Sequence, residues 1–199
     1  MSKREFIRNA FSTEQDTVLS NVLIDPCLES YFPSLNECDL SVMTDSIRQF
    51  GIISPIILWK FENKNVLVDG FHRYRIAISM DAFLLRNNYK FIHFADFNQV
   101  KEWMISIHYP FRKLTTQQKC YYRGEMVLLT ASNRNLSLSS AIELTSGKFS
   151  VSAHTIKNDY KYAVRVNQLK KKDNPLAKSI LEGTSGILKR DLIKSFEWP

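Results

Sequence analysis

The residues best suited to hold an anion lie in residues 66–77, Val-Leu-Val-Asp-Gly-Phe-His-Arg-Tyr-Arg-Ile-Ala. Apolar residues lead into an Asp-Gly pair and then recur at helical spacing, which predicts a strand, a tight turn and a helix. The N–H groups and positive dipole end of that helix would face outward, and Gly70 would let an anion approach the backbone. His72, Arg73 and Arg75 add donors suited to phosphate. An ordinary strand-to-helix connection, with exposed arginines that the core does not need, carries equal weight.

A second group of polar residues lies in residues 138–164, where apolar residues at helical spacing predict two helices. The first helix ends near Thr145, Gly147 makes the turn, and the second helix begins at Ser152 or His154. This order is the layout of a DNA-binding helix-turn-helix, whose second helix enters the major groove.

The second of these helices carries the side-chain types that read and hold DNA. Asparagine can read adenine through two hydrogen bonds, serine and threonine reach bases or phosphates, and lysine neutralises phosphate charge. The alternative is a helical hairpin that packs on the first domain and exposes its lysines, but the turn, the polar residues and the charge together favour DNA binding. The residues that we expect to face the groove are Ser152, His154, Thr155, Asn158 and Lys161, with Lys157 near a phosphate.

Charge is unevenly distributed along the 199 residues, whose formal net charge is +7. Residues 1–111 carry 11 Lys/Arg against 13 Asp/Glu, whereas residues 112–199 carry 16 against 7. A basic second half suits an anionic polymer such as DNA. Charge alone leaves a solvated basic face as an equal alternative.

The composition fits a globular protein of one medium domain or two small ones, with 44% apolar and 24% charged residues. No apolar run approaches the roughly 20 residues of a membrane-spanning helix, and no signal-peptide segment follows the N-terminus, so we expect no membrane contact. Cys27, Cys38 and Cys120 are odd in number and lack metal-ligand spacing. They predict reduced thiols in a cytoplasmic protein and no metal site.

Local signals predict an α/β domain with a mixed sheet followed by an all-α domain. An N-terminal arm, the α/β domain and the all-α domain are expected over residues 1–16, 17–110 and 111–199. Strands are expected near residues 17–24, 55–61, 66–68 and 90–94, with a hairpin turn at 63–65. Gly51 should end a helix, Asp96 should begin one, and Thr115 with Gln118 should form the capping box of a long helix.

Two stretches of the first domain resemble the ParB/sulfiredoxin superfamily. Residues 69–77, Asp-Gly-Phe-His-Arg-Tyr-Arg-Ile-Ala, resemble its Gly-x-x-Arg-x-x-Ala box. Upstream, residues 46–56, Ser-Ile-Arg-Gln-Phe-Gly-Ile-Ile-Ser-Pro-Ile, resemble its helix-Gly-x-x-x-Pro-strand segment. Residues 141–160 are similar to many bacterial helix-turn-helix segments. The resemblance covers most of residues 17–165 and implies a nucleotide-binding ParB-like domain that precedes a helix-turn-helix.

The resemblance implies a nucleoside triphosphate, CTP or ATP, as a ligand. The residues that it assigns to the phosphates are Gly70, His72, Arg73, Arg75 and Arg112. Sulfiredoxins place a reactive cysteine immediately before their His-Arg pair, and because this chain has a phenylalanine there, that thiol chemistry is excluded at this position.

The third box of ParB-type nucleotide switches, Glu-Asn-x-x-Arg, supplies magnesium ligands. The equivalent stretch is residues 107–111, Ile-His-Tyr-Pro-Phe. An isoleucine cannot ligate a hard cation, and histidine substitutes poorly for an oxygen ligand. We therefore expect no Mg²⁺ site and little nucleotide hydrolysis.

These observations predict a ParB-like DNA-binding protein of the partition or plasmid and mobile-element type. Its expected partners are double-stranded DNA, a second copy in a homodimer and a partition-type protein. The alternative is a nucleotide-dependent enzyme of the same superfamily, either a small-molecule kinase or nuclease-like. A kinase needs a general base and metal ligands near the box, and no paired carboxylates lie close to it in the sequence. We expect no catalytic residues and at most a weak nucleoside triphosphatase.

Overall fold

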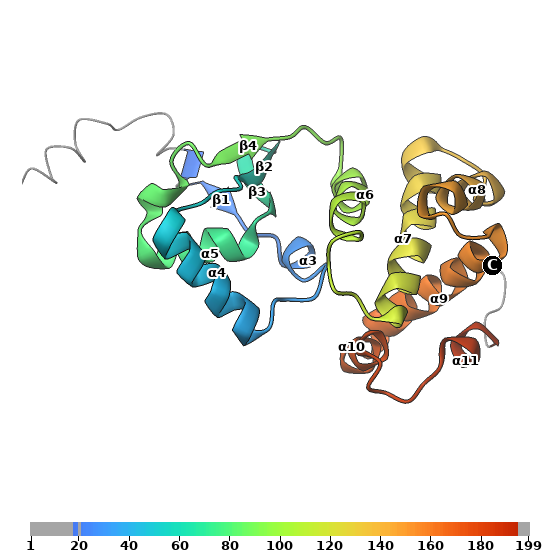
Figure 1. Cartoon of the computed structure of the whole chain (residues 1–199). Helices are drawn as coiled ribbons and strands as arrows, with labels where there is room; N and C mark the ends of the chain where they lie inside the picture. Colours follow the sequence, from blue (N-terminus) through green and yellow to red (C-terminus); the bar gives the residue numbers. More distant parts are fainter. Residues whose placement is uncertain (1–17, 20, 195–199) are drawn as a thin grey trace, which may run out of the picture. The chain divides into compact units, whose positions relative to one another are not determined.

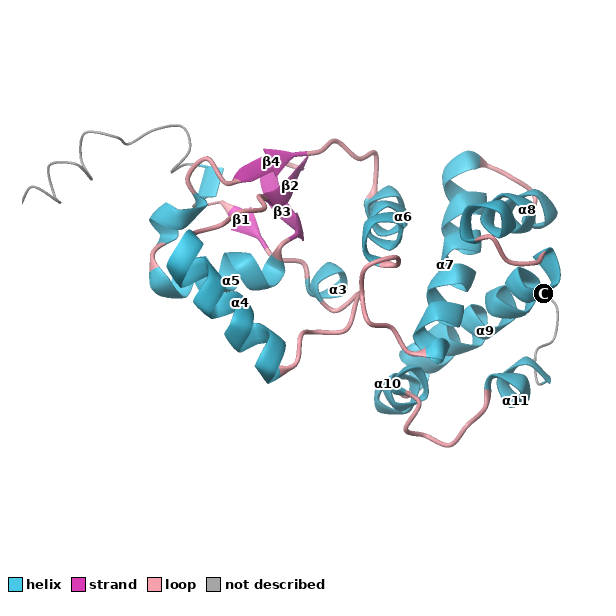
Figure 2. Cartoon of the chain, viewed as in Figure 1, coloured by secondary structure: helices cyan, strands magenta, loops and turns pink. Residues whose placement is uncertain are grey.

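The computed structural model describes residues 18–19 and 21–194, and the chain divides into two compact units, Met1–Ala95 and Asp96–Pro199 (Figures 1 and 2). The predicted arm, residues 1–16, lies outside the described residues. The division falls earlier than the boundary expected near residue 110. The reason is that helix α6 (Phe97–His108) packs against the long helix α7 (Thr116–Arg134) and so belongs to the second unit.

The first unit contains a four-stranded mixed sheet with the strand order β1-β3-β2-β4. Strands β2 and β3 form an antiparallel hairpin, whereas β1 pairs with β3 and β4 with β2 in parallel. The strands are β1 (Val22–Leu23), β2 (Ile56–Phe61), β3 (Lys64–Asp69) and β4 (Tyr89–Phe91). The predicted α/β class and mixed sheet are confirmed.

Helices cover one face of this sheet (Figure 1). Ile47 of α4 and Ile76 of α5 join Leu58 and Leu67 of the central hairpin in one buried apolar cluster. Gly51 ends α4 with a φ of 73°, as its position in the sequence predicts. From Val22 onward, the helical segments of this unit are α3 (Pro26–Glu29), α4 (Glu37–Phe50), α5 (Phe71–Met80) and the 3-10 turn η1 (Ala82–Leu85).

Two predictions for the first unit are wrong in detail. The strand expected over residues 17–24 is reduced to Val22–Leu23, and Val18 and Leu19 are helical. A short apolar run does not distinguish a strand from a helical turn, and here its first residues pack onto the apolar cluster. The hairpin turn lies at Glu62 and Asn63, whose φ values are 46° and 62°. Strand β3 therefore begins at Lys64 and not at residue 66. Two left-handed residues in a row suit a two-residue hairpin loop.

The described part of the second unit contains helices, turns and loops but no strand, and α7 is its centre (Figure 2). Helix α7 packs against α6, α8, α9 and α10. The predicted capping box is confirmed, because the Gln118 N–H donates to Thr115 Oγ1 at 3.1 Å and Gln118 Oε1 accepts from the Thr115 N–H at 2.9 Å. The remaining helices are α8 (Leu138–Phe149), α9 (Ala153–Lys172), α10 (Asn174–Glu182) and α11 (Lys189–Lys194).

The turn between α8 and α9 differs from the one predicted. Gly147 lies inside α8, and Ser150 ends the helix in the left-handed conformation with a φ of 53°. The N–H of Val151 then donates to the carbonyl of Ser146 at 3.2 Å, which closes the helix end. Ser152 is the N-cap of α9, which confirms the first of the two predicted starts, Ser152 and His154. The turn is therefore made by residues 150–152 and not by the glycine.

None of the helices in the described residues is both long enough and apolar enough to cross a membrane.

Helices α7 and α9 approach each other closely at Gly124. A Cβ atom there would overlap the Asp159 carbonyl oxygen and lie 2.6 Å from the Ala163 Cβ. Only a residue without a side chain fits between the two helices at this point. Val127, Ile142 and Ile156 continue the contact as a three-helix apolar cluster.

We predict that Gly124→Ala destabilises the second unit by about 1–3 kcal/mol or more, because the added methyl group forces α7 and α9 apart. Gly147→Ala is the matched control, since a Cβ there meets nothing within 4 Å. Its gain in helix propensity should stabilise the unit by about 0.5–1 kcal/mol. Urea unfolding followed by circular dichroism measures both, and equal effects of the two alanines would contradict the close crossing.

Candidate nucleic-acid interface

The first turn of α9 is fixed by its own hydroxyl groups. Ser152 Oγ accepts from the Thr155 N–H at 3.1 Å, and the two hydroxyl oxygens lie 2.9 Å apart. This is a serine N-cap, which satisfies one of the free donors of the helix. Both residues were expected to face DNA; the structure gives each of them a capping role at the start of the helix.

The polar side chains that follow lie on the accessible side of α9. His154 and Lys157 are exposed, and Asn158 and Lys161 are half-buried. Asn158 Nδ2 lies 3.1 Å from His154 Nε2, so the two side chains form a pair one helical turn apart. The structure therefore brings these four predicted residues together on the first three turns of one helix.

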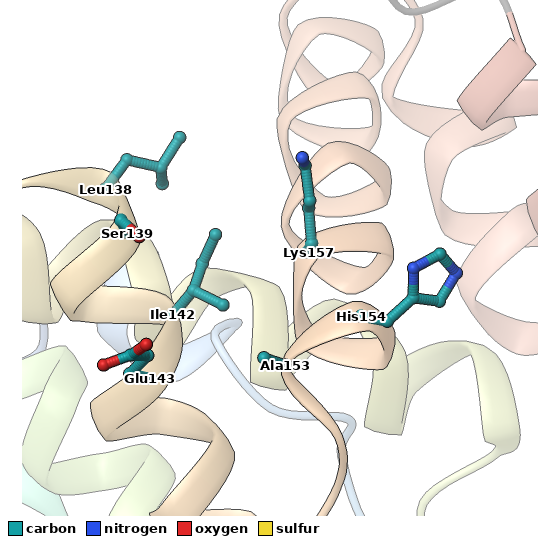
Figure 3. Close-up of a pocket in the computed structure, with 7 residues that line it drawn as sticks. All are labelled: Leu138, Ser139, Ile142, Glu143, Ala153, His154 and Lys157. Atoms are coloured by element: carbon teal, nitrogen blue, oxygen red, sulfur yellow. The ribbon is translucent and has the colours of Figure 1, made fainter.

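An open groove of about 330 Å³ runs between α8 and the start of α9 (Figure 3). Its apolar wall comes from α8, and its basic side chains come from α9. Figure 3 shows Lys157 extending along the side of α9 nearer to α8, while the His154 ring projects away from α8. The lining residues are Leu138, Ser139, Ile142, Glu143, Ala153, His154 and Lys157.

The opposite side of α9 is held by a buried charge cluster. Asp159 is fully buried, and its carboxylate accepts from Arg123 Nε of α7 at 2.6 Å and from Lys189 of α11. Arg123 also donates to the hydroxyl of Tyr109 at 3.0 Å. A buried carboxylate needs such partners, and removing one of them leaves an uncompensated charge. The cluster therefore fixes the rotation of α9 and hence which side chains face outward.

Sequence reasoning missed Asp159. It occupies a position between Ile156 and Ala163 that the apolar periodicity assigns to the buried side of the helix. An acidic residue on the buried face of a helix signals a basic partner in the core. Nothing in the local sequence identifies Arg123 and Lys189 as those partners.

A second polar network joins α7 and α9 toward the end of α9. The Tyr121 hydroxyl donates to Asn167 Oδ1 at 2.9 Å, and Asn167 contacts Glu125. Lys170 donates to the Tyr121 hydroxyl at 2.9 Å and lies over its ring. Burial lowers the pKa of Lys170 and raises the pKa of Tyr121. Lys170 is therefore half-buried and bound to Tyr121.

The predicted phosphate site in the first unit is the junction between β3 and α5. Gly70 caps α5 with a φ of 88°, and no side chain caps the helix. Arg73 bends back over this glycine, and its Nη2 donates to Asp69 Oδ2 at 2.8 Å while Nη1 donates to the Ser54 carbonyl at 2.8 Å. A Cβ at residue 70 would lie 2.9 Å from Ile56 Cγ2 and 3.0 Å from Arg73 Nη2. Glycine is therefore required by both the backbone angle and the packed guanidinium.

Two further donors at this junction are also engaged within the unit. Arg75 binds both oxygens of Glu29, at 2.8 and 3.0 Å, and the hydrogen bond to Glu29 raises the pKa of Arg75. His72 Nε2 accepts from the Leu35 N–H at 3.4 Å.

Arg112 belongs to the second unit, where it is half-buried. Burial raises the pKa of Tyr122, and the charge of Arg112 opposes that rise.

As arranged, the residues of the first unit do not fit a triphosphate. Asp69 and Glu29 neutralise the two guanidinium groups, so a phosphate would have to displace a carboxylate from each. The N–H groups at the start of α5 have no side-chain cap. Among the described residues, no group of three or more His, Cys, Asp and Glu side chains could hold a metal ion.

No known family model matches the sequence. No curated protein matches it either. Among solved structures, the chain is similar to the C-terminally truncated chromosome-partitioning protein ParB from Caulobacter crescentus. With that protein in complex with CTP-γ-S, the likeness has a TM-score of 0.36 at 15% identity and covers 88% of this chain and 96% of that one. With the same protein bound to the centromeric parS site, the TM-score is 0.43 at 15% identity, and the coverage is 88% and 95%. Likenesses this distant assign no role to any residue.

The two arginines of the junction should differ sharply in their importance for stability. Arg73 is held by two hydrogen bonds with its side chain 19% exposed, whereas that of Arg75 is 59% exposed. The alternative in which both arginines are exposed is therefore wrong for Arg73. We predict that Arg73→Ala destabilises the first unit by about 1.5–3 kcal/mol.

Arg75→Ala, the matched control, should cost only about 0.2–1 kcal/mol. Hydrogen exchange of the β2 and β3 amides in the full chain measures both effects within the first unit. If Arg73→Ala left these amides as protected as Arg75→Ala does, the contact with Asp69 and Ser54 would not be supporting the junction.

Proposed function

We propose that this chain is a DNA-binding protein whose contacts with duplex DNA are made by the first three turns of α9. The observation that carries the proposal is the pairing of two opposite faces on one helix. One face is locked by the buried Asp159, and the other presents His154, Lys157, Asn158 and Lys161 to solvent. A helix held in this way presents polar and cationic side chains at fixed positions, which reading a major groove requires.

The layout of α8 and α9 supports the same function. Two helices are joined by a short turn, and the second begins with a capped first turn, as in the recognition helix of a helix-turn-helix. The excess of Lys/Arg over Asp/Glu in residues 112–199 adds attraction to phosphate. A hairpin that served only for packing would not need a histidine, a lysine and an asparagine together on its accessible side.

We extend the proposal to the type of protein on the strength of the two sequence boxes at residues 46–56 and 69–77. They resemble those of ParB-like proteins, so we place this chain among bacterial DNA-binding proteins of partition or mobile-element type. A homodimer on a two-fold symmetric site is the arrangement that helix-turn-helix proteins commonly use. A partition-type partner protein belongs to the same proposal.

The sequence resemblance also brings CTP or ATP into the proposal, but the pairing of Arg73 and Arg75 with carboxylates does not support either nucleotide. Isothermal titration calorimetry of the full chain with CTP and with ATP tests this. We expect no binding heat. Binding of CTP or ATP that Arg73→Ala abolishes would instead support a nucleotide site at the junction between β3 and α5. Release of phosphate, or its transfer to an acceptor, would favour an enzyme of the same superfamily.

The DNA interface predicts separate effects for two neighbouring residues of α9. Lys157→Ala should weaken binding to all duplexes alike and reduce the slope of log affinity against log salt by about one. Asn158→Ala should instead weaken binding to the preferred site by about 1–3 kcal/mol and relax the base preference at one position. Fluorescence anisotropy with selected and scrambled duplexes, from about 50 to 200 mM salt, measures both.

Lys178→Ala is the matched control, because Lys178 is an exposed lysine on α10 of the same unit. It should change neither the affinity nor the salt slope. Affinity that does not depend on salt would contradict a DNA interface on α9. Equal losses of affinity in Lys157→Ala and Lys178→Ala would contradict it as well.

A further inference from the structure

The contact between His154 and Asn158 fixes the orientation of both side chains. The atom of Asn158 nearest to His154 Nε2 is Nδ2, at 3.1 Å. An amide nitrogen donates and does not accept, so His154 Nε2 must be the acceptor in this contact. In the tautomer that makes this contact, the ring proton lies on Nδ1.

This contact decides which atoms Asn158 keeps for another ligand. One N–H of its amide is used by His154, so one N–H and the carbonyl oxygen Oδ1 remain. In the major groove adenine offers the N7 acceptor beside the N6 donor, which matches one donor and one acceptor. Guanine offers two acceptors, N7 and O6, and the carbonyl of Asn158 would face one of them.

We propose that His154 is a positioning residue that sets Asn158 to read adenine and to reject guanine. This inference rests on the proposed function and adds the base that one position of α9 selects. His154 acts through the amide of Asn158 and not through its own contact with a base. The His154 ring is exposed and lies on the same side of α9 as Asn158, so it can orient the Asn158 amide.

The orientation of the Asn158 amide should change when a different side chain stands at residue 154. A side chain at residue 154 that only accepts keeps Asn158 Nδ2 inward and Oδ1 outward, so adenine remains preferred. A side chain that only donates draws Oδ1 inward and turns the two N–H groups outward, which suits the two acceptors of guanine. His154→Glu and His154→Lys are therefore a matched pair, because residues four apart on a helix stay within reach of each other.

The test is selection of duplexes from a randomised library by the full chain and by these two variants, followed by sequencing. We expect the unaltered chain and His154→Glu to prefer adenine over guanine at one position, and His154→Lys to reverse that preference, each by about tenfold. The added charges change affinity for all sequences alike and so do not affect the ratio of the two bases. Both variants are repeated with Asn158→Ala, where neither should change the base preference.

A preference that is the same in all three proteins overturns the inference, and so does a shift to guanine by His154→Lys that survives Asn158→Ala, since the new lysine would then be reading the base itself. A measurement without DNA separates this failure from failure of the proposed function. The ¹⁵N chemical shifts of the His154 ring should show the Nδ1–H tautomer in the free chain, and the Nε2–H tautomer would overturn the inference even if DNA binds. If no duplex binds, the proposed function fails, and the inference fails with it.

Discussion

The second unit depends on the close crossing of α7 and α9 at Gly124. The missing side chain lets the backbone of α9 approach α7, and this approach places Asp159 against Arg123 in the interior. A carboxylate without water is stable only when opposite charges and hydrogen bonds surround it, so Arg123 and Lys189 are required once α9 lies this close. An apolar contact at the same place would tolerate rotation of α9, because packing has no direction, whereas the charge cluster does not.

That fixed rotation is what connects the core of the second unit to its surface. Residues on the Asp159 side of α9 are buried, and the side that carries His154 and Lys157 is accessible. Ser152 fixes where α9 begins, so the position of each side chain along the axis of α9 is defined as well. The geometry of the proposed interface thus follows from interactions that lie behind it.

In the first unit, by contrast, ion pairs occupy the predicted phosphate site and do not hold its side chains out for a ligand. Arg73 and Arg75 have the types and spacing of phosphate ligands, yet both bind carboxylates of their own unit. Gly70 is needed there because the Arg73 guanidinium packs over it. The same residues that favour an anion in the sequence therefore stabilise the strand-to-helix junction in the structure.

Features that depend on neighbouring residues could be predicted from the sequence, and features that depend on distant ones could not. The capping box at Thr115, the caps at Asp96 and Ser152, and the end of α4 at Gly51 all follow from local hydrogen bonding and are confirmed. The turn expected at Gly147 lies instead at Ser150, because a capping pattern and not the most flexible residue ended the helix. The partners of Arg75 and Asp159 come from segments far along the chain, and no periodicity identifies them.

The measurement that tests the central claim most directly is NMR mapping of backbone amide shifts during titration of the full chain with duplex DNA. The account predicts that the largest changes fall on residues 150–161, at the turn and the first turns of α9. The amides of α7 around Gly124 should change little, because that contact supports the interface from behind. Largest changes in residues 21–95, with α9 unaffected, would contradict the account.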